Sequence, residues 1–257
     1  MKRKLDFLLR TQNVDVVFED EALIVLNKPA HLLVLPDRYD QTLHNLQTLL
    51  SDELGTIFTV HRIDKETSGL VLFAKTAAGH ANLSQQFENR TVSKVYKAIV
   101  HGDPPEQHGE INLPLSERNR RMRVDEKNGK ESATDFTVLE RFHGYAFVEA
   151  RPRTGRMHQI RVHLKEIGLP IVGDPLYGDG KPFFLSGVKS NYKVEGEEKP
   201  LLTRTALHAS SLHMLHPGSG QEMRFEADLP KDMRTVLKYL RKFRSEDSET
   251  QMRGSRK

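Results

Sequence analysis

The order of the apolar segments along the chain limits its fold more than any other feature. Short runs with strand-like composition recur along almost the whole chain, and only a few longer segments carry apolar residues at helical spacing. Strands and helices do not alternate regularly, so a doubly wound parallel sheet is not indicated. The sequence therefore predicts an α+β fold.

The individual segments give a first map of the elements. Strands are expected at 16–18, 23–26, 70–74, 94–100, 133–141 and 145–151, and as a pair within 207–225. Helices are expected at 42–50, 76–90, 159–167 and 231–243, where apolar residues recur every three or four positions. In the first of these helices, Asp40 or Thr42 could serve as the N-cap.

The same map suggests one main domain. Residues 1–13 form an N-terminal extension, and 14–244 form the domain, with no internal repeat and no linker that would divide it. Residues 178–203, rich in Gly, Lys and Glu over most of their length, are expected to be an inserted loop. The polar, basic residues 245–257 are expected to be a disordered tail.

Composition excludes several classes of function. The chain has no cysteine, which rules out disulfides, thiolate catalysis, Cys-ligated zinc and iron–sulfur clusters. No apolar run is long enough to cross a membrane, so we expect a cytoplasmic protein without a membrane partner. The spacing of His208, His213 and His216 matches no standard metal motif, and no metal site is predicted.

Positive charge gathers in two places. Residues 116–130 contain six basic and three acidic side chains, and the chain from Lys231 to its end contains nine and four. Such clusters can neutralise RNA phosphates, but on charge alone a solvated loop and a solvated tail are the favoured interpretation.

The segment His61–Leu70 carries the most chemical information. Asp64 follows Arg62 and precedes Lys65 in a polar stretch before a buried strand, and an adjacent arginine favours the ionised carboxylate that a nucleophile or base requires. By itself the pattern also fits a turn residue or a surface ion pair. The residues His61–Asp64 also look like the catalytic-loop triplet of protein kinases with one insertion. A kinase is not expected, because the chain has neither a Gly-rich phosphate loop nor Asp-Phe-Gly.

Six motifs in a fixed order make the chain resemble the RluA-type pseudouridine synthases over roughly residues 14–242. They are Leu26–Pro29, His61–Leu70, Lys94–Ala98, Thr154–Leu164, Gly173–Gly178, and Leu207–Ala209 with His216–Pro217. Each alone is weak, but all six in order are specific. Met157 departs from the threonine or serine usual in this family, without bearing on the chemistry.

The resemblance implies a pseudouridine synthase fold and a set of site residues. The fold has a central, mixed, largely antiparallel sheet flanked by helices and loops, with an RNA-binding cleft. The expected catalytic residues are Asp64 as the carboxylate, Tyr96 for proton transfer, and Arg161 as the basic partner of the aspartate. Arg62 would enter the RNA stack that the uridine leaves. The remaining RNA-binding candidates are His61, Arg156, His158, Gln159, Arg120, Arg121 and Arg123.

The implied activity is isomerisation of uridine to pseudouridine in ribosomal or transfer RNA, without metal or cofactor and by a monomer. Family members often carry an S4-like domain, and about 13 residues before the core are too few for one. Two alternatives stay open: an RNA-binding or ribosome-assembly protein with secondary catalysis, and an unrelated enzyme such as a metal-dependent nuclease. Intact Asp64, Tyr96 and Arg161 argue against the first, and the lack of clustered ligands argues against the second.

Overall fold

The chain forms two compact units in the computed structural model, which describes residues 9, 11–119, 121–194 and 196–245. The first unit comprises the chain up to Val95 and the segment His208–Asp228. The second comprises Tyr96–Leu207 and the chain from Leu229 onward. The chain therefore passes from one unit to the other inside β5 (Ser93–His101), at the start of β11 (Leu207–Leu215), and after Asp228.

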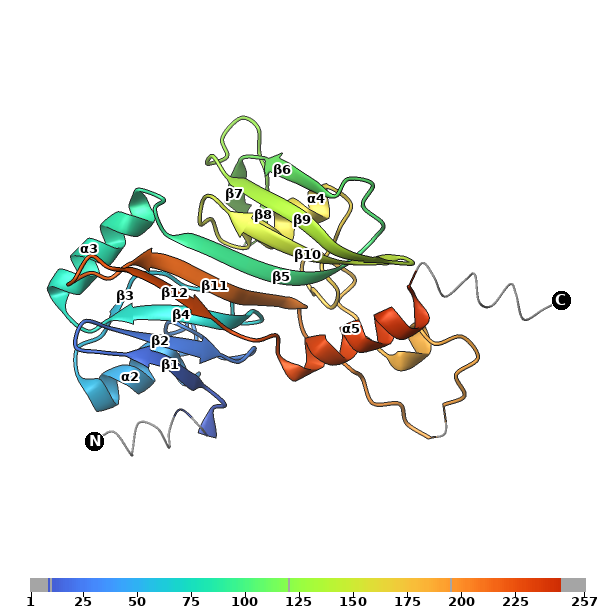
Figure 1. The fold of residues 1–257 in the computed structure, drawn as a ribbon, viewed down its shortest axis with the longest axis horizontal. Coiled ribbons are helices and arrows are strands. Elements are labelled where there is room, and N and C mark those ends of the chain that lie inside the picture. Colours follow the sequence, from blue (N-terminus) through green and yellow to red (C-terminus); the bar gives the residue numbers. More distant parts are fainter. Residues whose placement is uncertain (1–8, 10, 120, 195, 246–257) are drawn as a thin grey trace. The chain divides into compact units, whose positions relative to one another are not determined.

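The first unit is built on a mixed sheet (Figure 1) with the strand order β1-β2-β4-β11. All its neighbours are antiparallel except β4 and β11, which are parallel. The short β3 pairs with β4, and β12 pairs with β11. Its strands are β1 (Asp15–Glu19), β2 (Leu23–Lys28), β3 (Phe58–Thr59), β4 (Ser68–Ala74), β11, and β12 (Glu222–Glu226).

Every residue of β4 is buried, as expected for a strand with neighbours on both sides and both faces covered. Gly69 allows β11 to come close. Its φ is +112°, and a Cβ at this position would lie 2.2 Å from the carbonyl oxygen of Ala209. Only glycine fits here. The start of β4, which follows the Asp64 segment, is thus fixed against β11.

The helices of the first unit are α2 (Leu46–Leu54) and α3 (Ala77–Glu88). The expected helix at 76–90 is confirmed as α3, with Thr76 as its N-cap. The other helix begins four residues later than expected. Asn45 is its cap and accepts a hydrogen bond from the amide of Thr48, whereas Asp40 accepts from the amide of Thr42 and closes a turn.

The second unit contains an antiparallel sheet with the order β5-β10-β9-β6. Its strands are β5, β6 (His108–Asn112), β9 (Ala133–Phe142) and β10 (Tyr145–Pro152). The β9–β10 pair confirms the expected hairpin, and Gly144 in its turn has a φ of +76°. The strand β6 was not predicted, because Ile111 is its only buried apolar side chain.

Helices α4 (Gln159–Glu166) and α5 (Lys231–Phe243) complete the second unit, close to the expected ranges. Met233, Val236, Leu237 and Leu240 of α5 are buried in the main hydrophobic core of this unit, as their spacing predicted. Phe243 is only half-buried and instead stacks on the ring of Tyr239.

The basic segment 116–130, expected to be a loop, contains the antiparallel hairpin β7 (Leu115–Arg118) and β8 (Arg121–Val124). Leu115 and Met122 are buried and form a small apolar cluster with Val162 of α4. The charged residues between Leu115 and Met122 hide the strand pattern of buried and exposed positions in the sequence. The inserted loop 178–203 is also tied down, because Phe183 and Leu202 are buried and form a β-bridge.

Candidate functional site

Asp64 lies in the first unit, in the turn that leads into β4. Its side chain is half-buried, whereas the preceding Arg62 is exposed. Ile63 and Thr67 are buried on either side, and the amide of Thr67 bonds to the carbonyl oxygen of Asp64 at 3.1 Å. The carboxylate is therefore presented by a short turn whose two ends are anchored in the protein.

A fully buried lysine fixes this turn through hydrogen bonds to backbone carbonyl oxygens. The Nζ of Lys28 donates hydrogen bonds to the carbonyl oxygens of Pro29 and Leu32, each at 2.8 Å, and to that of Lys65 at 3.3 Å. The amide of His31 donates to the same Lys65 oxygen at 2.7 Å. The residue after Asp64 is thus tied to the loop after β2, and backbone carbonyls partly compensate the buried cation.

His61 supports the same turn from inside the protein. Its Nε2 accepts a hydrogen bond from the amide of Leu72 at 3.0 Å, and its ring stacks on Phe87 with centroids 4.8 Å apart. Burial, and then the charge of Lys94, lower the pKa of His61 to about 3. The ring is therefore neutral near pH 7. Its Nε2 and one ring face serve the interior, which favours a positioning role over the expected RNA contact.

Tyr96 lies in the second unit, on β5 and opposite Ala150 of β10. The side chain is half-buried and packs against the edge of the main core of this unit. The neighbouring Lys97 pairs with Glu149, which also pairs with Arg151 at 2.6 Å. The sheet thus fixes the backbone of Tyr96 and leaves part of its side chain accessible.

Arg161 on α4 is buried with Asp174. Its Nε and Nη2 each donate to one carboxylate oxygen at 2.7 Å, and its guanidinium lies 5.1 Å from the ring centroid of Tyr177. Burial would raise the pKa of Asp174. The hydrogen bonds and charge of Arg161, with the amides of Leu176 and Tyr177, outweigh burial and lower that pKa. The pair is ionised and held in a fixed orientation.

The residues around the start of α4 have separate roles. Gln159 is 3% exposed, and its amide bonds to four groups: Thr154, Ala133, Thr134 and the amide of Arg156. These bonds favour a role in fixing the segment before α4, and the expected RNA contact of Gln159 stays a prediction.

His158 and Arg156 remain accessible in part. His158 is the residue before α4 and has a φ of +52°, with its Nδ1 2.9 Å from the hydroxyl of Tyr177. Arg156 is half-buried and donates from its Nε to the carbonyl oxygen of Glu131. Both side chains are oriented by the fold, and we keep them as RNA-binding candidates.

On the β7–β8 hairpin, Arg121 and Arg123 are exposed on the face opposite the buried Met122. Arg118 lies directly across from Arg121 in the register. Like charges in such a pair repel each other. Arg120, predicted with them, lies outside the described residues.

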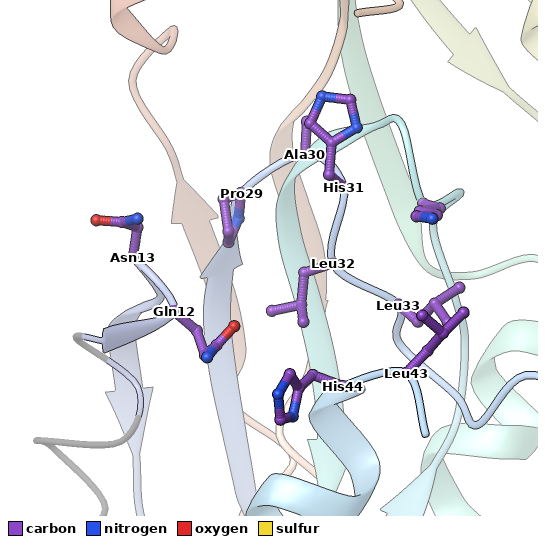
Figure 2. Close-up of a pocket in the computed structure, with 10 residues that line it drawn as sticks. Gln12, Asn13, Pro29, Ala30, His31, Leu32, Leu33, Leu43 and His44 are labelled. Atoms are coloured by element: carbon purple, nitrogen blue, oxygen red, sulfur yellow. The ribbon is translucent and has the colours of Figure 1, made fainter. Parts of the chain in front are cut away.

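A cavity of about 310 Å³ lies beside the Asp64 turn in the first unit. Figure 2 shows the residues that line it, with the Leu32 side chain drawn above the ring of His44 in this view. The side chains come from the segments before β1, after β2 and before α2, and Lys65 completes the lining.

Within the ranges that the structure describes, no group of three or more His, Asp or Glu side chains could hold a metal ion. None of the helices found in those ranges is both long and apolar enough to cross a membrane.

Sequence reasoning missed three functional supports: Lys28, Asp174 and Tyr177. All three lie within motifs that were recognised, Leu26–Pro29 and Gly173–Gly178. Their presence in the motifs indicated that they matter for the site. Their roles could not be predicted, because the buried hydrogen bonds of Lys28 and Asp174 join residues that only folding brings together.

Comparison with known proteins gives concordant matches. The family described as RNA pseudouridylate synthase matches residues 22–166. The chain is 38% identical over 248 residues to the uncharacterized RNA pseudouridine synthase YlyB of Bacillus subtilis, covering 93% of this chain and 76% of that one. It is 37% identical over 242 residues to ribosomal large subunit pseudouridine synthase D of Zymomonas mobilis, with 88% and 73% covered. The structure of human RNA pseudouridylate synthase domain containing 4 matches with a TM-score of 0.70 and 25% identity, covering 94% and 98%.

Proposed function

Because this chain belongs to the RNA pseudouridylate synthase family, we propose that it isomerises specific uridines of ribosomal or transfer RNA through the carboxylate of Asp64. The chain is an RNA pseudouridine synthase of the RluA type with the pseudouridine synthase fold. What we propose beyond the family is the role of Asp64 as the catalytic carboxylate and ribosomal or transfer RNA as the substrate. Ribosomal RNA is suggested by the names of relatives such as the Zymomonas mobilis protein.

The anchored position of Asp64 carries the proposal. The carboxylate lies in the signature segment, on a turn held by buried Ile63, Thr67 and Lys28. A group that reacts with one atom of a substrate has to be held in place, and loops fixed to a rigid sheet commonly do this. The exposed Arg62, two residues earlier, is suited to fill the space that the uridine leaves in the RNA stack.

The reaction requires one bond to break and another to form. The C1′–N1 bond of uridine breaks, the base rotates, C1′ bonds to C5, and the proton at C5 is replaced by one at N1. No electrons are gained or lost overall. Asp64 could attack C1′ or C6 or remove the C2′ proton. The family resemblance assigns proton transfer to Tyr96 and the cation that accompanies the carboxylate to Arg161.

The test is Asp64→Asn, which keeps the shape of the side chain and removes its charge. We expect no pseudouridine to form on total RNA from cells lacking the gene, while RNA affinity and melting temperature stay near wild type. Pseudouridine mapping after incubation with each purified protein measures this. Near wild-type turnover by a folded Asn variant would show that Asp64 is not the catalytic carboxylate. A wild-type protein that binds RNA but modifies none would favour a ribosome-assembly role.

A further inference from the structure

The cavity beside the Asp64 turn has the chemistry of a site for a single RNA base. Its volume of about 310 Å³ is at the lower end of the roughly 300–1,000 Å³ typical of small-ligand pockets. Pro29, Leu32, Leu33 and Leu43 give it apolar walls. A nucleobase has two apolar faces and a polar edge, so walls of this kind can enclose its faces.

The lining also includes polar side chains of the kind that can pair with the edge of a base. Gln12, Asn13 and His44 line the cavity. Within the described part of the chain, neither the side-chain amide of Gln12 nor the imidazole of His44 forms a hydrogen bond with another residue. A side-chain amide offers both a donor and an acceptor, the combination that pairs with the edge of a base.

The charge of the rim fits a polyanion. Lys65 is exposed and lines the cavity, and it directly follows Asp64 in the sequence. His31 also lines it and pairs through Nδ1 with Glu66 at 2.9 Å. A phosphate next to a bound base would meet the cation of Lys65, which favours RNA over an apolar peptide as the occupant.

The wall of the cavity and the Asp64 turn are one connected structure. Lys28 bonds to Pro29, Leu32 and Lys65, and the amide of His31 bonds to Lys65 as well. A base seated against Leu32 would therefore fix the RNA at a constant distance from Asp64. Such a contact sets which nucleotide along the strand reaches the carboxylate.

We propose that this cavity binds an unpaired base flanking the target uridine and so helps to select the uridine that is modified. The proposal rests on the proposed function, because it names the part of the RNA substrate that the chain recognises beside Asp64. Gln12 and His44 are the specificity-determining side chains, and Leu32 and Leu43 provide the apolar surface.

The experiment measures RNA binding by full-length protein carrying Asp64→Asn, so that turnover cannot alter the probe. The probes are short single-stranded RNAs with one central uridine and adenosine, cytidine or guanosine flanks, each also made with single abasic positions. Leu43→Trp fills the cavity from a residue that is 37% exposed, so the fold should tolerate it. Leu215→Trp, at a residue that is 44% exposed in the same unit, is the matched control.

We expect one abasic position to weaken binding by roughly tenfold, the order of one base read by specific contacts. Leu43→Trp should weaken binding of the intact RNA to the same extent and make the abasic position neutral, whereas Leu215→Trp should do neither. Gln12→Ala with His44→Ala should reduce the preference among flanking bases. If Leu43→Trp has no effect, or weakens intact and abasic RNAs equally, the cavity does not read a base.

The two proposals can fail separately. If the protein with Asp64 intact makes no pseudouridine, but Leu43→Trp abolishes base-dependent RNA binding, the proposed function is wrong and the base site stands. If the protein modifies RNA, but the Leu43→Trp variant binds every probe normally, only the base site is wrong. The proposal would also be overturned if a protein partner binds over Gln12 and His44 and no RNA binding depends on a base.

Discussion

Arg161 and Asp174 are both buried, and each bonds to the other through two hydrogen bonds. Removing one member of such a pair leaves an uncompensated charge, whereas replacing both with apolar residues is often tolerated. This asymmetry makes it possible to separate a structural role of Arg161 from a catalytic one.

We expect Asp174→Leu alone to lower the free energy of unfolding by about 3–5 kcal/mol, and Arg161→Met with Asp174→Leu to recover most of that loss. The double variant should stay inactive, because the catalytic proposal requires the cation of Arg161. Urea unfolding and single-turnover pseudouridine formation measure the two effects. Recovery of activity together with stability would mean that Arg161 serves only to neutralise Asp174.

His61 gives a prediction about pH. Burial and the charge of Lys94 lower its pKa from 6.5 to about 3, so between these values the unfolded chain binds a proton that the folded chain does not. The stability from the neutral ring is complete above pH 6.5. It is lost as pH falls toward 3, by up to about 1.4 kcal/mol per pH unit.

His61→Gln should therefore flatten the pH dependence of stability. Between about pH 7 and pH 5.5 the wild type should lose about 1 kcal/mol more than the variant, whatever the baseline cost of losing the Phe87 contact. His108→Gln, at an exposed histidine, is the control and should follow the wild type. Equal losses in wild type and His61→Gln would show that His61 is not held neutral.

At the scale of elements, the β7–β8 hairpin places arginines on one exposed face. Arg118 and Arg121 face each other as like charges, an arrangement that an RNA phosphate between them would relieve. The buried side of the same hairpin, Leu115 and Met122, packs on α4. The arginines are thus carried by a fixed element rather than by the loop expected from the sequence.

Changing Arg121 and Arg123 to Ala should weaken RNA binding and flatten its dependence on salt. Each lost phosphate contact lowers the log–log slope by about 0.7 to 0.9, and the modified site should not change. The matched control is Arg224→Ala with Arg241→Ala, which removes equal charge from residues paired with Glu226 and Glu140. Equal effects of the two double variants would mean that the hairpin contributes only general charge.

The elements differ in how far the sequence predicts them. Strand β4 and helix α5 were foreseen because an unbroken apolar run and a helical apolar stripe survive in any context. The hairpin β7–β8 was missed, since only two of its eight residues are buried and its charges mask the alternation. Asp64 was found through its motif, but the support from Lys28 was not, because their segments lie far apart in the sequence.

At the scale of the whole molecule, the first unit is assembled from two distant parts of the chain. Strands β11 and β12 return to it after the entire segment Tyr96–Leu207 has formed part of the second unit. They bring Leu212, Met214 and Phe225 into the core of the first unit, and β11 pairs in parallel with the buried β4. Without them β4 would lose a neighbour and the core would lose part of its apolar surface.

We therefore expect residues 1–95 alone not to fold, and the same residues joined to 208–228 to fold. Ser210 donates to the carbonyl oxygen of Val95 at 3.2 Å, so a short flexible linker can connect Val95 to His208. Circular dichroism during urea titration should show a cooperative transition only for the joined protein. Leu212→Asp in the joined protein is the control and should abolish that transition, because it buries a charge in the core. A cooperative transition of residues 1–95 alone would show that β2, β4 and α3 suffice. The start of β4, and with it the Asp64 turn, would then be fixed without β11.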